Sequence, residues 1–70
     1  MLDNNSLVVF SYLRNHFSKS DKSLQFPEIN IQELSFKDIE ESFKTLLNHG
    51  KITTTDTDYL NRITVTGIVD

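Results

Sequence analysis

The feature that most constrains the fold is a helix whose two ends are both marked in the sequence. Ser35 is a good N-cap residue, and Asp38 stands three positions later, where its side chain can bond back to the cap. Gly50 stands where a residue in the left-handed conformation ends a helix. Between these ends apolar residues recur at helical spacing: Phe36, Ile39, Phe43, Leu46 and Leu47. The sequence therefore predicts an amphipathic helix between Ser35 and Gly50.

Two runs rich in β-branched residues follow this helix, at 51–55 and 62–66. A polar turn at 56–58 separates them, and Gly67 follows the second run. β-Branched side chains favour strands, and a polar turn between two such runs is typical of a hairpin. We expect an antiparallel β-hairpin whose second strand ends at Gly67.

The N-terminal part of the chain predicts a second amphipathic helix, over 4–18. Asp3 is a suitable N-cap, and Leu2 and Leu7 stand at the positions of a hydrophobic staple around it. The core-facing stripe of this helix consists of Val9, Phe10, Leu13 and Phe17. With the two later elements, we expect one shared core: Phe10, Leu13, Phe17, Ile39, Phe43, Leu46, Ile52, Ile63 and Val65.

Between the two helices the signals are mixed. Residues 24–26 alternate like a short edge strand that Pro27 ends. In the segment 27–34, Ile29 and Ile31 alternate as in a strand. However, Pro27 suits a first helical turn, and Asn30 and Glu33 have the spacing of a capping box. The interpretation favoured for 27–34 is a short helix.

This order of elements resembles a winged helix-turn-helix domain. The stretch FKDIEESFKTLLNHGKI is similar to the recognition helix of that family running into its first wing strand, and RITVTG is similar to the returning strand. The predicted fold class is therefore α+β, with three helices, a short strand and a C-terminal β-hairpin wing. Seventy residues suffice for a single domain, which spans 1–70.

The resemblance implies double-stranded DNA as the partner, with the third helix in the major groove and the wing near the backbone. A protein of this kind acts as a small transcriptional or phage and mobile-element regulator, and the Asn-, Ile- and Lys-rich composition fits a bacterial or phage origin. The outward side chains of the third helix and the wing are the candidate DNA-binding residues: Lys37, Lys44, Thr45, Asn48, Lys51 and Arg62.

The charge of the chain favours a different partner. The formal net charge is −3, whereas DNA-binding domains carry a basic face. On the outward side of the third helix, Asp38 and Glu41 offset Lys37 and Lys44. The alternative prediction is a protein-interaction module without DNA binding.

Two surfaces are predicted for such an interaction: the acidic-centred third helix, or the spare apolar side of the first helix. Val8 and Tyr12 lie one turn apart, to one side of the core stripe, where they form a joint apolar patch. We expect this interaction patch to bind a protein partner or a second copy of the chain. Partial cover by the N-terminus or the hairpin is the alternative.

The residue types offer little for other chemistry. Without cysteine there is neither a disulfide nor a thiolate metal site, and the cytoplasm is the expected compartment. His16 and His49 have no partner at ligand spacing, and 56–58 lacks the other ligands of a calcium loop. The longest apolar run, 7–10, is far too short to span a membrane. We therefore predict no catalytic residue, metal, cofactor, membrane contact or small-molecule substrate.

Overall fold

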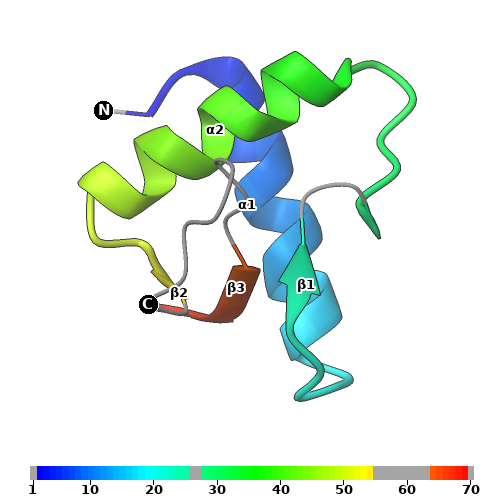
Figure 1. The fold of residues 1–70 in the computed structure, drawn as a ribbon, viewed down its shortest axis with the longest axis vertical. Coiled ribbons are helices and arrows are strands. Elements are labelled where there is room, and N and C mark those ends of the chain that lie inside the picture. The colour runs from blue at the N-terminus through cyan, green and yellow to red at the C-terminus, as the bar shows by residue number, and fades with distance from the viewer. Residues whose placement is uncertain (1, 26–27, 55–63, 70) are drawn as a thin grey trace.

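The computed structural model describes residues 2–25, 28–54 and 64–69. Its elements, in chain order, are α1 (Asn4–Phe17), β1 (Leu24–Gln25), α2 (Phe36–Asn48), β2 (Ile52–Thr54) and β3 (Thr64–Ile68). Helix α2 crosses the N-terminal part of α1, and the strands lie below α2 (Figure 1). The predicted α+β class is confirmed.

Helix α1 begins where its sequence signals place it. The Asp3 side chain accepts a hydrogen bond from the backbone N–H of Ser6, so one of the free N–H groups of the first turn is satisfied. Hydrogen bonding from Ser6 also holds the pKa of Asp3 below its ordinary value. At the other end, the Ser18 N–H donates to the Arg14 carbonyl and closes the last turn.

Helix α2 is fixed at both ends by side-chain and backbone geometry. Ser35 and Asp38 form a reciprocal capping box, in which each side chain accepts a hydrogen bond from the other's backbone N–H. At the C-terminal end, Gly50 has φ 68°. The Gly50 N–H donates to the Leu47 carbonyl and the Lys51 N–H donates to the Leu46 carbonyl, which is the Schellman arrangement. Both predicted end signals are confirmed.

The three described strands form one antiparallel sheet in the order β1-β3-β2. Strand β1 pairs Leu24 with Val65, so the predicted edge strand is confirmed at 24–25. The β2–β3 register shifts between Thr53 and Thr54, which leaves Thr66 as an extra residue on β3. Because of this bulge, Val65 and Ile68, three residues apart, both pack toward the core.

The bulge also explains why glycine occupies position 67. Thr53 Oγ1 hydrogen bonds to Thr66 Oγ1 across the two strands, at 2.9 Å. A Cβ at Gly67 would lie 3.2 Å from that same Thr53 oxygen. Gly67 lies within β3 rather than after it, so the prediction that it ends the strand is wrong.

Both helices and all three strands contribute to one core. Its buried apolar residues are Val9, Leu13, Leu24, Ile29, Ile31, Ile39, Phe43, Leu46, Ile52 and Val65. Six of the nine predicted core residues are in this set, Phe10 and Phe17 are half-buried against it, and Ile63 lies outside the described residues. Ser6 and Ser42 are also buried, on the faces that α1 and α2 turn inward.

The predicted winged helix-turn-helix architecture with three helices is wrong. The described residues form two α-helices, and 28–34, for which the sequence favours a helix, contain no α-helix and have 3₁₀ geometry at Glu28 alone. Ile29 and Ile31 are buried while Asn30 between them is exposed, a pattern of period two that one helical face does not produce. A turn closed by the Leu34 N–H and the Ile31 carbonyl then leads into the cap of α2.

Candidate functional site

Most of the predicted DNA-binding residues lie along the outer side of α2. Lys37, Lys44 and Asn48 are exposed, and Lys51 is exposed directly after the helix ends. Thr45 is half-buried on the same helix. Arg62 lies outside the described residues. The structure thus brings four of the six predicted side chains to the surface of one helix and its exit.

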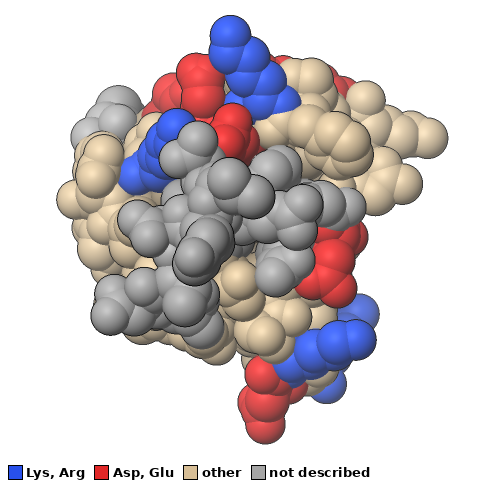
Figure 2. All heavy atoms as spheres, viewed as in Figure 1, with Lys and Arg blue, Asp and Glu red and all other residues tan. Residues whose placement is uncertain are grey.

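The charges on this side of α2 alternate in sign. Lys37, Glu41 and Lys44 follow one another at helical spacing, so the carboxylate of Glu41 lies between the two lysines on one exposed face. Acidic and basic side chains are also interspersed over α2 in the view of Figure 2. Among the residues that the structure describes there, no continuous basic strip forms.

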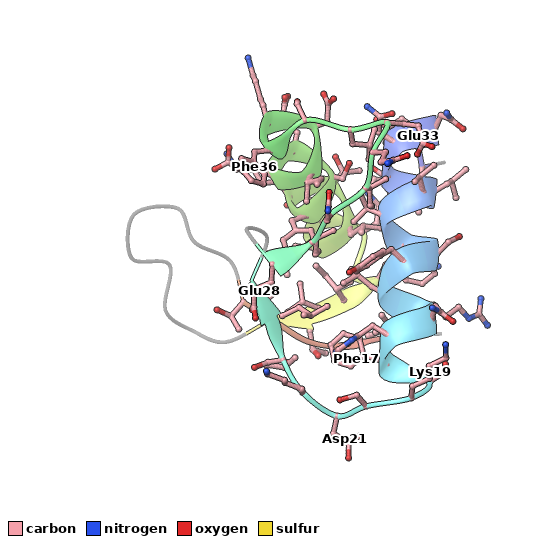
Figure 3. All side chains as sticks on the ribbon, turned by 90° about the vertical axis from the view of Figure 1, so that its right-hand side faces the viewer. Phe17, Lys19, Asp21, Glu28, Glu33 and Phe36 are labelled. Carbon is pink, nitrogen blue, oxygen red and sulfur yellow. The ribbon has the colours of Figure 1, made fainter. Side chains whose placement is uncertain are left out.

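The least expected side chain on α2 is Phe36. It is the first residue of the helix and is 63 % exposed, although its spacing predicts a core position. Figure 3 shows Phe36 on the side of α2 that faces away from α1. Leu47, near the other end of the helix, is 41 % exposed.

Phe36 and Leu47 belong to one stripe of the helix surface. At about 100° per residue, positions 36, 40, 44 and 47 fall within about 80° of each other around the helix axis. We call these four residues the α2 stripe: Phe36, Glu40, Lys44 and Leu47. Glu40 is half-buried and Lys44 is exposed, and neither forms an ion pair within the described part of the chain. The stripe has apolar ends and one charge of each sign between them.

The stripe is held on a rigid support. The adjoining face of α2 buries Ile39, Phe43 and Leu46 in the core, and the capping box and the Schellman end fix the two termini of the helix. Side chains on a helix anchored in this way keep their relative positions when they bind a partner, so less conformational entropy is lost on binding.

The predicted interaction patch on α1 has a different environment. Val8 and Tyr12 are both half-buried and pack against the core, which agrees with the alternative of partial cover. Leu7 on the same helix is 48 % exposed, although the staple with Leu2 predicts that it is covered. A role of Val8 and Tyr12 in association stays a prediction.

The two histidines are bonded to backbone carbonyl groups. His16 Nε2 donates to the Lys22 carbonyl at 2.7 Å, and its ring meets that of Phe17 edge-on, with centroids 4.7 Å apart. His49 Nδ1 donates to the Thr45 carbonyl at 2.9 Å. His16 thereby ties the polar connector to the end of α1, and His49 supports the last turn of α2. Within the described ranges, no group of three or more acidic or histidine side chains is placed to hold a metal ion.

Sequence reasoning placed Phe36 and Leu47 in the core stripe, because a helical wheel puts both directly beside the residues that are buried. Ile39, Phe43 and Leu46 span about 60° of the wheel, whereas Phe36 and Leu47 both fall beyond one and the same margin of that arc. Together the five residues cover only about 100°, an ordinary width for a core-facing stripe, so the wheel alone does not show that the two at its margin are exposed.

The chain was compared with protein-family models, with curated proteins and with solved structures, and none of them matches. Of the helices described, none has the length and apolar character required to cross a membrane.

Proposed function

We propose that this protein is a small protein-interaction module that binds its partner through the α2 stripe. The observation that carries the proposal is Phe36, a phenylalanine 63 % exposed on a helix that is capped at both ends and anchored in the core by its adjoining face. Aromatic side chains are enriched in protein interfaces, where a few rigid, desolvated residues supply most of the binding energy. The absence of cysteine supports a cytoplasmic setting for this function.

The charges of α2 favour a protein over a nucleic acid. A DNA-binding helix gains its affinity from cations placed against phosphates. Here Glu41 lies between Lys37 and Lys44, so any phosphate near the lysines is also near a carboxylate. The net charge of −3 adds repulsion at longer range. A protein surface, by contrast, can present both signs of charge to this helix.

DNA binding is the second candidate function, because Lys37, Lys44 and Lys51 are all exposed along α2 and its exit. With these three and Arg62 as the contacting cations, log K should fall with log salt at a slope of about −3 to −4. An NMR titration with random duplex DNA at low salt tests this. Unchanged amide shifts at Lys44 and Asn48 with excess duplex would remove this candidate.

Site-specific photocrosslinking tests the protein-interaction function. A photoreactive phenylalanine analogue is placed at position 36, and a matched control carries it at the exposed position 41, about 140° around the same helix. After irradiation in cells of the source organism, we expect a discrete protein adduct from position 36 that the control lacks and that Leu47→Lys removes. Adducts of equal yield from both positions, or none from either, would contradict the proposed function.

A further inference from the structure

The α2 stripe is complementary to itself when a second copy is turned end for end. Along the helix it reads Phe36, Glu40, Lys44, Leu47, so reversal places an apolar residue opposite an apolar residue and a carboxylate opposite an amine. From this we infer that the partner bound by the stripe is a second copy of this chain, in a two-fold antiparallel α2–α2 pair. The inference rests on the proposed function and names the partner of that same surface.

The axial positions of the four side chains agree with one symmetry axis. Pairing Phe36 with Leu47 of the second copy places the two-fold axis midway between positions 41 and 42. Pairing Glu40 with Lys44 of the second copy places the axis level with position 42. The two requirements differ by half a residue, which is about 0.8 Å along the helix. All four contacts therefore form together in a single arrangement.

The state of the charged residues also suits this arrangement. Glu40 and Lys44 form no ion pair in the described part of the single chain, so both can pair across the axis. Phe36 and Leu47, near the two ends of α2, then cover the central charges from both sides and exclude water there. A parallel arrangement would instead place Glu40 beside Glu40 and Lys44 beside Lys44.

The size of the surface sets the strength of the pair. One helix of 13 residues is about 20 Å long, and a contact between two such helices buries less area than a standard stable interface. We therefore expect a transient dimer with a Kd on the order of 100 µM. Such a pair is populated at the high local concentration of an assembly or a tethered site.

Sedimentation equilibrium of the purified full chain, from about 10 µM to about 1 mM, tests the inference. Wild-type protein should change from monomer to dimer over this range. Glu40→Lys places two lysines opposite each other at both contacts, and Lys44→Glu places two carboxylates there, so each variant alone should dimerise at least about tenfold more weakly. Mixing the two variants in equal amounts restores both opposite-charge contacts and should return the dimer.

A matched mixture separates the predicted register from general charge attraction. Glu41→Lys changes the net charge as Glu40→Lys does, but position 41 lies outside the stripe. Alone, Glu41→Lys should dimerise as wild type does, because both contacts are intact. In its mixed dimer with Lys44→Glu only one of the two contacts is restored, so mixing should add no dimer beyond that of Glu41→Lys itself. Circular dichroism verifies that each variant is folded. Phe36→Ser, at an exposed position, provides a second disruptive variant if Glu40→Lys does not fold.

The inference is overturned if wild-type protein stays monomeric at 1 mM, or if adding Lys44→Glu raises dimerisation of Glu41→Lys as much as it raises that of Glu40→Lys. Photocrosslinking at position 36 then tells which proposal fails. An adduct of this chain with a different protein keeps the interaction function and removes self-pairing, whereas the absence of any adduct removes both.

Discussion

Two phenylalanines on one helix provide a direct test of how α2 is oriented. Phe43 is fully buried and Phe36 is 63 % exposed, although both lie in α2 and both belong to the apolar spacing of the sequence. Phe43→Ala removes a ring from the centre of the core and should lower the free energy of unfolding by about 3–5 kcal/mol. A domain of 70 residues has a total stability of about 4–10 kcal/mol, so this variant should lose between about a third and all of it.

Phe36→Ala is the matched control. Roughly a third of this side chain is buried, and complete burial of a phenylalanine is worth about 1.5–3 kcal/mol, so the expected loss is about 0.5–1 kcal/mol. Urea unfolding followed by circular dichroism measures both variants, and Phe43→Leu, with an expected loss of about 1 kcal/mol, stays within a measurable range. Equal destabilisation by the two alanine substitutions would refute the orientation of α2 on which the α2 stripe depends.

Three further predictions concern the caps and the bulge. Ser35→Ala removes one half of the capping box and should lower the free energy of unfolding by about 1 kcal/mol, as measured by urea unfolding. Gly67→Ala should lower the melting temperature, because the new Cβ meets Thr53 Oγ1. Adding Thr53→Ala should recover part of this loss. If the two substitutions lower the melting temperature additively in the double variant, the close contact is contradicted. Because the pKa of Asp3 is lowered in the folded state, its charged form stabilises the protein above pH 3.8, and this contribution is lost as pH falls through the lower folded pKa. Asp3→Asn keeps a capping oxygen but has no charge to lose. Its melting temperature should therefore approach that of wild type as the pH falls below 3.8. A difference in melting temperature that does not change with pH would argue against the charged cap as the source of that difference.

Local signals predicted the helices well because they act within one turn. The cap at Asp3, the capping box at Ser35 and the left-handed Gly50 each satisfy backbone groups of neighbouring residues, whatever the rest of the chain does. The segment after Pro27 shows the opposite case. Asn30 and Glu33 have capping-box spacing, yet no α-helix forms there. Ile29 and Ile31 are instead buried on alternate residues, and that burial depends on contacts with distant parts of the chain.

The candidate site was predictable in part. Sequence spacing placed Lys37, Lys44 and Asn48 on the outer side of α2, and the structure confirms their exposure. Spacing alone did not reveal where the core ends around the helix, so Phe36 was assigned to the wrong side of that boundary. That boundary depends on how much of the surface of α2 the neighbouring elements cover. The sequence of the helix alone does not determine this.

The bulge at Thr66 changes how substitutions in β3 should be tolerated. A regular strand gives a mutational profile in which sensitive positions alternate with permissive ones. In β3 the inward-packing Val65 and Ile68 are instead separated by Thr66 and Gly67, so the profile should show a spacing of three. Deleting Thr66 would restore the two-residue alternation of a regular strand and leave Val65 and Ile68 two positions apart, so both would still face the core. We therefore expect β3 to tolerate a one-residue deletion at the exposed Thr66, whereas a one-residue insertion within β2 would move the side chains beyond it to the other face of the sheet.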